Sequence, residues 1–267
     1  EKIMKKFLTV ALAGVLAASM LFTGCSKKAE SKVPDKLIVG TNAEFPPFEY
    51  MNDKKQPEGF DIAMIKEIGK RMGKKVEIKN MEFKSLIGAM ESDSINAIIA
   101  GMTKTEKREK AVDFSDSYYT TNQAIILKKD SKITKLAQLD GKKIGVQEGT
   151  TGDLISSGDK FGDGKKAKVL VKGAKVKRFK KGVDAVMDLK NGSVDAVVID
   201  ELTANEFVKK NAKKLKIVID SAGSEYYCIA LTKGNTAYKE EVNKQIKAIK
   251  EDGTYDKLKA KYIDSKN

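Results

Sequence analysis

The chain has 267 residues, of which 41% are hydrophobic, enough to bury one large core or two smaller ones. It contains no histidine and no tryptophan, which excludes a Ser-His-Asp triad, a Cys-His dyad and a His-ligated zinc site. The formal charge is +14, but the basic residues are spread among acidic ones without an aromatic-basic pattern, so we expect no nucleic-acid partner.

The first residues have the features of an exported lipoprotein. Lys5 and Lys6 precede an apolar run over residues 7–22, which is shorter than the ~20 apolar residues of a membrane-spanning helix. The run ends at Leu21-Phe22-Thr23-Gly24-Cys25, which resembles a bacterial lipobox, where cleavage leaves the cysteine first and a lipid such as palmitate is attached to its sulfur. We predict a signal peptide over residues 1–24, a lipidated Cys25, and a flexible tether over residues 25–36. A signal anchor is the alternative.

From residue 36 onward, strand patterns alternate with helical patterns. Strands are expected over residues 37–40, 76–78, 97–100, 143–147, 176–179, 196–199, 217–219 and 226–232. Helices are expected over residues 60–68, 85–91, from about 105, 153–157, 183–189, 202–209 and 238–262, the last interrupted at Asp252-Gly253. This alternation predicts an α/β fold with parallel sheets and helices on both faces. The Lys- and Gly-rich stretch 158–173 fits neither pattern and is interpreted as a surface insertion.

Two junctions between a predicted strand and a helix carry aromatic side chains. In open α/β sheets, ligands bind beyond the carboxyl ends of the strands. Phe45 follows the first strand, ahead of the stiff Pro46-Pro47, and Phe83 precedes the helix near Ser85. Each ring is interpreted either as a flat apolar plate against a ligand or as a core aromatic.

Three other junctions carry polar groups. Thr103, with Glu106 three residues on, fits a helix capping box; alternatively, Gly101 and Thr103 donate to an anion while Arg108 binds a carboxylate bidentately. Gln147 to Gly152 form a second potential anion cradle at a helix start. Asp200 ends an apolar strand and serves either a ligand or the following helix as a cap.

The sequence indicates neither a metal nor a cofactor. Residues 159–164 look superficially like a calcium loop, but Phe161 occupies a ligand position. Gly141-Lys142 lacks the remaining residues of a phosphate-binding Walker A loop. The only cysteines, Cys25 and Cys228, form neither a disulfide framework nor a metal motif.

Several motifs occur together in one order along the chain. They are Phe45 to Tyr50, Gly59 to Ile62, Ala100 to Arg108 followed by Asp113 to Tyr119, Gly149 to Gly152, Val194 to Val197 with Asp200, and Glu251 to Tyr255. Over about residues 37–262, the sequence resembles the extracellular solute-binding proteins of family 3, the polar amino-acid-binding proteins of bacterial ABC importers.

The resemblance implies the type II periplasmic-binding-protein fold, in which two α/β lobes joined by two crossover strands close on one amino acid. Lobe 1 is then expected over residues 34–123 and 225–267, and lobe 2 over residues 124–224, with crossings near residues 122–126 and 225–229. It also implies a monomer without catalytic residues, anchored on the extracytoplasmic side of the cell membrane. Such a protein binds a free amino acid and delivers it to importer permease subunits.

The resemblance further implies roles for individual residues. Arg108 binds the ligand α-carboxylate, Asp200 pairs with the α-ammonium, and the two Phe rings enclose the side chain. Because the two charged residues lie on different lobes, closure depends on the ligand. The expected ligand-binding residues are Asn42, Glu44, Phe45, Phe83, Ala100, Gly101, Thr103, Arg108, Gln147, Thr150, Thr151 and Asp200.

A basic amino acid is the favoured ligand. Aromatic faces suit a planar guanidinium, and Glu44 with Asn42 and Glu148 would supply an acidic end to the pocket. Alternatively, both Glu side chains face solvent, and Asn42 and Gln147 hydrogen-bond a neutral polar ligand. Two rival functions remain: an exported dehydratase-like enzyme of the same fold that uses Glu44 or Glu148 as acid or base, and a ligand-sensing module.

Overall fold

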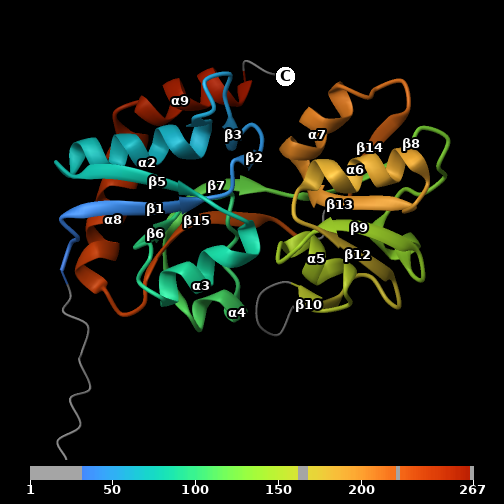
Figure 1. Ribbon diagram of the computed structural model, residues 1–267, viewed down its shortest axis with the longest axis horizontal. Helices are drawn as coiled ribbons and strands as arrows, with labels where there is room; N and C mark the ends of the chain where they lie inside the picture. The colour runs from blue at the N-terminus through green and yellow to red at the C-terminus, as the bar shows by residue number, and fades with distance from the viewer. Residues whose placement is uncertain (1–31, 162–167, 221–222, 265–267) are drawn as a thin grey trace, which may run out of the picture. The chain divides into compact units, whose positions relative to one another are not determined.

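The computed structural model describes residues 32–161, 168–220 and 223–264, all within one compact unit that spans Ser31–Asn267 (Figure 1). The predicted signal peptide and lipidated Cys25 lie outside the described residues. Within the described ranges, no helix combines the length and apolar character that crossing a membrane requires.

The first of two five-stranded sheets has the strand order β5-β1-β6-β15-β7. Its strands are β1 (Lys36–Thr41), β5 (Lys75–Asn80), β6 (Ala97–Ile98), β7 (Val112–Thr121) and β15 (Glu225–Thr232). Its helices are α2 (Phe60–Arg71), α3 (Leu86–Glu91), α4 (Glu106–Glu109), α8 (Thr236–Glu251) and α9 (Thr254–Tyr262), and the 3-10 turn η1 (Phe83–Ser85) precedes α3. Figure 1 shows α2 and α9 on one side of this sheet and α3 on the other.

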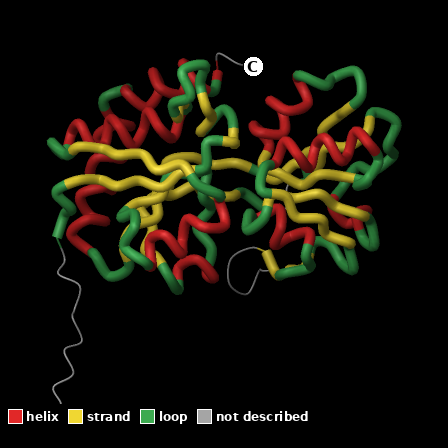
Figure 2. Tube along the Cα trace, viewed as in Figure 1, coloured by secondary structure: helices red, strands yellow, loops and turns green. Residues whose placement is uncertain are grey.

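The second sheet has the order β12-β9-β13-β8-β14. Its strands are β8 (Gln123–Lys128), β9 (Lys143–Gln147), β12 (Lys175–Phe179), β13 (Ala196–Asp200) and β14 (Leu215–Ile219). Its helices are α5 (Thr151–Ser156), α6 (Gly182–Asn191) and α7 (Glu201–Lys209), with a 3-10 turn η2 (Leu136–Leu139). Helices again cover both faces, as the colouring in Figure 2 shows.

The prediction of parallel sheets is wrong for two strands, β15 and β8. β1 pairs in parallel with β5 and β6, and β9 with β12 and β13, but β15 is antiparallel to β6 and β7, and β8 is antiparallel to β13 and β14. The reason is the route of the chain. Only Asn122 separates β7 from β8, so an extended segment enters the second sheet without the helical crossover that a parallel neighbour requires.

Other differences are local. The sequence analysis missed β7, whose Asp, Ser and Thr residues hide any alternation of apolar and polar positions. It also missed a small sheet of β2 (Glu44–Phe45), β3 (Glu49–Met51) and β4 (Pro57–Glu58). The helix expected from about residue 105 is only the four-residue α4. In the stretch 158–173, the described residues include a hairpin of β10 (Lys160–Phe161) and β11 (Lys168–Val169).

Apolar periodicity builds the core that holds the strand ends in place. On α2, the buried residues Phe60, Met64, Ile65 and Ile68 share one face and pack in a cluster that includes Leu37 of β1. Each such side chain contributes about 1.5 to 3 kcal/mol on burial. The rigid sheets therefore fix the loops that follow β1, β6, β9 and β13, which carry the polar residues singled out in the sequence.

Candidate functional site

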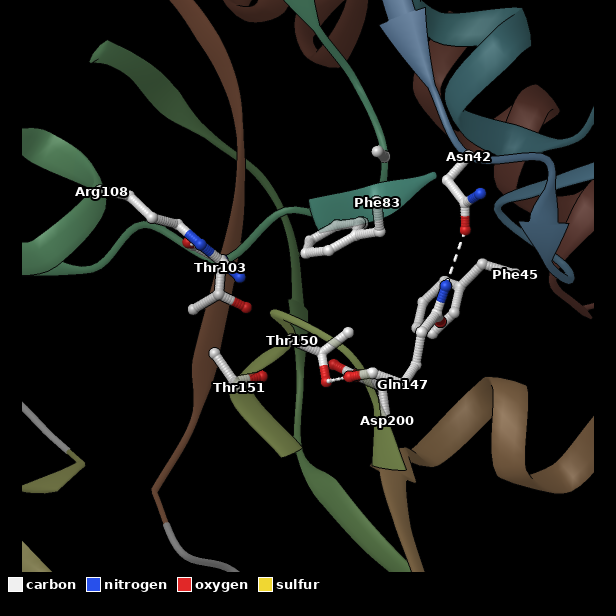
Figure 3. A pocket seen from close by; sticks show the side chains of 11 residues that line it. Asn42, Phe45, Phe83, Thr103, Arg108, Gln147, Thr150, Thr151 and Asp200 are labelled. Atoms are coloured by element: carbon white, nitrogen blue, oxygen red, sulfur yellow. Dashed lines mark hydrogen bonds between the residues drawn. The ribbon is translucent and has the colours of Figure 1, made fainter. Parts of the chain in front are cut away.

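A pocket lies among the loops at the carboxyl ends of these strands (Figure 3). It contains eleven of the twelve residues expected from the sequence; Glu44 is the exception. The lining residues are Asn42, Phe45, Phe83, Ala100, Gly101, Thr103, Arg108, Gln147, Thr150, Thr151 and Asp200. They come from segments that precede β7 and from segments that follow β8, so both sheets contribute.

Arg108 is a fixed and buried cation. Its side chain is 7% exposed, and its guanidinium donates to the carbonyl of Thr103 at 2.5 Å and to that of Gly149 at 3.0 Å. The guanidinium carbon lies 5.3 Å from the centre of the Phe83 ring. Burial lowers the pKa of Arg108 to about 10, so it stays protonated at neutral pH. A guanidinium held in this way is suited to bind an anion from within the pocket.

The capping-box interpretation of Thr103 is wrong. The N-cap of α4 is Thr105, whose hydroxyl accepts from the backbone amide of Arg108 at 3.2 Å. The Thr103 hydroxyl instead donates to Glu225 at 2.6 Å. The expected anion-binding role of the Gly101 amide also needs correction, because that amide donates to the Asp61 carboxylate at 2.7 Å.

The residues between β9 and α5 form the capped N-terminus of α5. The Thr150 hydroxyl accepts from the amide of Asp153 at 3.3 Å and donates to the Gln147 carbonyl at 2.7 Å. A Cβ at Gly152 would stand only 2.6 Å from the Val198 carbonyl, so glycine lets α5 approach β13 closely. This approach brings Thr151 into the pocket lining beside Asp200 at the end of β13.

Two carboxylates are buried at the pocket. Asp200 is 4% exposed and accepts from the Tyr227 hydroxyl at 2.7 Å, and it makes no side-chain cap on α7, so the capping interpretation is wrong. Burial, followed by the negative charge of Glu225, raises the pKa of Asp200 to about 8. Burial also raises the pKa of Glu225, although hydrogen bonding by Thr103 and the charge of Arg108 act in the opposite direction.

Sequence reasoning missed Glu225, Tyr227 and Gln123. The Gln123 amide donates to the Thr151 hydroxyl at 3.2 Å, and the other two residues contact Thr103 and Asp200 as described. All three lie in the runs predicted only as crossings between lobes. The available signal was a polar side chain within a strand that is otherwise buried.

The other end of the pocket is neutral and aromatic. The Gln147 amide donates to the Asn42 side-chain oxygen at 2.8 Å, as the dashed line in Figure 3 shows, and to the Lys180 carbonyl at 3.2 Å. Phe45 lines the pocket and also stacks on Phe48, with ring centres 6.0 Å apart. Phe83 belongs to a hydrophobic core cluster as well as to the lining. Both rings therefore belong to the core and also line the pocket, and their contact with a ligand stays a prediction.

The prediction that Glu44 and Glu148 give the pocket an acidic end is wrong. Glu44 pairs with Lys181 at 2.6 Å and Glu148 with Lys84 at 3.0 Å, and neither carboxylate lines the pocket. A third pair joins Glu82 to Lys180 at 2.6 Å. Each of these three rim pairs joins a segment that precedes β7 to one that follows β8. Folding brings a lysine next to each of the two Glu residues that were expected to be unpaired acids, and each ion pair neutralises the charge of its Glu.

The chemistry of the site defines a class of protein. A pocket that presents a buried guanidinium, a buried carboxylate and two aromatic rings, from two α/β sheets, suits a small zwitterion that carries a side chain. Residues 37–265 match the bacterial extracellular solute-binding proteins, family 3, and the chain belongs to this family. Its fold is the two-lobed periplasmic-binding-protein fold.

Individual relatives cover nearly the whole chain. The arginine-binding extracellular protein ArtP of Bacillus subtilis is 33% identical over 97% of this chain and 98% of its own length. ABC transporter arginine-binding protein 1 of Escherichia coli is 33% identical over 84% and 89%. Two solved structures of an ancestral arginine-binding protein, one bound to arginine and one to glutamine, are each 41% identical, with a TM-score of 0.76. They cover 87% of this chain and 100% and 99% of their own.

Proposed function

We propose that this protein binds one polar amino acid in the pocket and delivers it to the permease of an ABC importer. The observation that carries the proposal is the placement of buried Arg108 and buried Asp200 in one pocket lining, Arg108 from α4 beside the first sheet and Asp200 from the end of β13 in the second. Arg108 binds the α-carboxylate and Asp200 the α-ammonium. The names of two related proteins, which state that they bind arginine, support an amino-acid ligand.

The same placement supports ligand-driven closure. In our proposal, lobe 1 comprises residues 34–123 and 225–267 and lobe 2 residues 124–224, and the lobes move apart when the pocket is empty. A ligand that bridges Arg108 and Asp200 binds the closed form better than the open form, and this difference shifts the population. The permease then distinguishes loaded from empty protein by shape.

A basic amino acid is the ligand that we propose first, and a neutral polar one second. Two related proteins are named for arginine, and an ancestral one was solved with both arginine and glutamine. Calorimetry with arginine, lysine, glutamine and glutamate tests both levels of the proposal. Absence of binding to every amino acid would overturn the function, and tight glutamine binding without any response to the basic pair would overturn the preference.

A dehydratase-like enzyme is less well supported than a binding protein. It requires an acid or base at the ligand, and the two residues suggested for this role, Glu44 and Glu148, are paired with lysines outside the lining. Incubation of the purified protein with the amino acid that it binds, followed by mass spectrometry, distinguishes the two functions: a new product would show catalysis.

Lipid anchoring is part of the proposal and gives a cellular prediction. Replacing Cys25 by serine removes the sulfur to which the lipid would be attached. We therefore expect the Cys25→Ser protein to leave the membrane fraction, whereas the unchanged protein stays there. Cell fractionation measures this, and a variant that keeps its signal peptide and still pellets with membranes would favour a signal anchor instead.

The three rim pairs give a second prediction. Because each joins the two sides of the pocket, replacing Glu44, Glu82 and Glu148 together by glutamine should favour the open form and weaken ligand binding. Exposed ion pairs contribute little and are screened by salt, so we expect a loss of about two- to tenfold at low ionic strength. Calorimetry in ~1 M salt should bring the variant and the unchanged protein together. A loss that persists in salt would assign these residues a direct role in ligand binding.

A further inference from the structure

The pocket lining contains one buried cation, Arg108, and one buried acid, Asp200, and a second buried acid, Glu225, contacts the lining through Thr103. Arg108 is 7% exposed, Asp200 4% and Glu225 1%. The rim pairs add no net charge, because each matches one Glu with one Lys. With both carboxylates ionised, the pocket therefore carries a net charge of minus one.

Glu225 is the first residue of β15 and lies behind Thr103 of the pocket lining, to which it is hydrogen-bonded. One of its oxygens accepts from the Thr103 hydroxyl at 2.6 Å, and the other is buried without a hydrogen-bond partner among the described residues. The side chains of Thr151 and Gln123 are close enough to favour its ionised form. A buried carboxylate that is only partly paired is costly, so it binds either a proton or a cation readily.

The groups around the two carboxylates do not remove this excess of negative charge. They include Tyr227, which donates to Asp200, and the nearby Tyr118 and Glu49, in addition to Arg108. Burial raises the pKa values of both tyrosines well above the ordinary value, so both phenols stay neutral, and Glu49 is itself an acid. Arg108 is thus the single cation among the described groups that surround the pair.

We propose that Glu225 is a specificity-determining residue. When the pocket is empty or holds a neutral amino acid, Asp200 and Glu225 together keep one proton; when it holds a cationic amino acid, that proton passes to the solvent. The extra positive charge of the ligand then balances the second carboxylate. This inference rests on the proposed function of the same site, and it explains how a pocket whose side-chain end is neutral selects a basic ligand.

The mechanism predicts a pH-dependent preference. Arginine binding is coupled to the loss of a proton, whereas binding of citrulline, its neutral ureido analogue, is not coupled in this way. The ratio of arginine to citrulline affinity should therefore rise by up to about tenfold per pH unit until the pair has lost its shared proton. Both ligands carry the same α-ammonium group, so its own titration cancels in the ratio.

Calorimetry of the unchanged protein tests this directly. Titrations near pH 7, repeated in buffers with different ionisation enthalpies, count the protons released on binding. We expect arginine to release close to one proton more than citrulline or glutamine does. Equal release by arginine and the neutral ligands would overturn the inference while leaving the proposed function intact, and absence of binding to any amino acid would overturn both.

A matched pair of variants tests the residue. Glu225→Gln keeps the size of the side chain and removes one negative charge, so it should lower the arginine to citrulline affinity ratio about tenfold or more and abolish the extra proton release. Glu240→Gln makes the same change on the exposed side of α8 and should alter neither. A Glu225→Gln protein with the original ratio would overturn the inference. If circular dichroism shows that this variant is unfolded, the number of protons that the unchanged protein releases on binding arginine, compared with citrulline, tests the inference instead.

Discussion

Replacing Arg108 by alanine is expected to abolish measurable amino-acid binding while the protein remains folded. The guanidinium is buried in the pocket lining and is the proposed partner of the ligand α-carboxylate. Removing one partner of a desolvated charge pair costs about 2 to 5 kcal/mol, or about thirty- to several-thousandfold in affinity. Calorimetry measures the loss, and circular dichroism reports whether the fold persists.

Arg108→Lys is the matched control. Lysine keeps the charge but lacks the planar fork that donates to the carbonyls of Thr103 and Gly149. Because the Gly149 contact joins a segment before β7 to one after β8, we expect the lysine variant to bind more weakly than the unchanged protein but more tightly than the alanine variant. An alanine variant of unchanged affinity would show that the guanidinium does not contact the ligand.

Most of the pocket lining was predictable because it follows strand ends. Asn42, Gln147 and Asp200 each stand within two residues of the end of a strand, and carboxyl ends of neighbouring parallel strands meet at one edge. Glu225 and Tyr227 obey no such rule. They lie inside an antiparallel strand whose position depends on pairing with β6 and β7, far away in sequence. The pattern of residues near Glu225 and Tyr227 in the sequence gives no information about which distant strands pair with β15.

The charges of the site were harder to predict than its positions. A glutamate in a loop is either a ligand-binding acid or half of an ion pair, and only folding brings Lys181 to Glu44 and Lys84 to Glu148. The reverse holds for Glu225, which folding buries without a lysine partner and with one carboxylate oxygen that has no hydrogen-bond partner among the described residues. The sequence analysis placed the additional acidic groups, Glu44 and Glu148, at the side-chain end of the pocket. In the structure, the additional acidic group is Glu225, near Asp200.

A second pair of buried acids, away from the pocket lining, predicts a large effect on stability. Glu49 is fully buried beside Asp61, and Asp61 accepts from the Tyr118 hydroxyl and the Gly101 amide, each at 2.7 Å. Burial, followed by the charge of Asp61, raises the pKa of Glu49 well above its ordinary value. The folded protein therefore keeps a proton that the unfolded chain loses above about pH 4.3.

This linkage lowers stability as pH rises. From the unfolded pKa of Glu49 up to its raised folded pKa, the free energy of unfolding falls by about 1.4 kcal/mol per pH unit. Glu49→Gln removes the titration and keeps a donor toward Asp61, although its second amide N–H, left without an acceptor, costs about 1 to 2 kcal/mol. We therefore expect the variant to gain stability relative to the unchanged protein between about pH 4 and about pH 7, by about 1.4 kcal/mol for each pH unit over which folded Glu49 keeps its proton.

Urea unfolding at about pH 4 and about pH 7 measures this effect. The advantage of Glu49→Gln should be present at neutral pH and disappear in acid, where the unfolded chain also keeps the proton on Glu49. Glu240→Gln, on the exposed side of α8, should follow the unchanged protein at both values. Equal pH dependence in the Glu49→Gln and unchanged proteins would mean that Glu49 is ionised in the folded state. Asp61 would then face a second negative charge in the core, and the hydrogen bonds to Tyr118 and Gly101 would have to stabilise both.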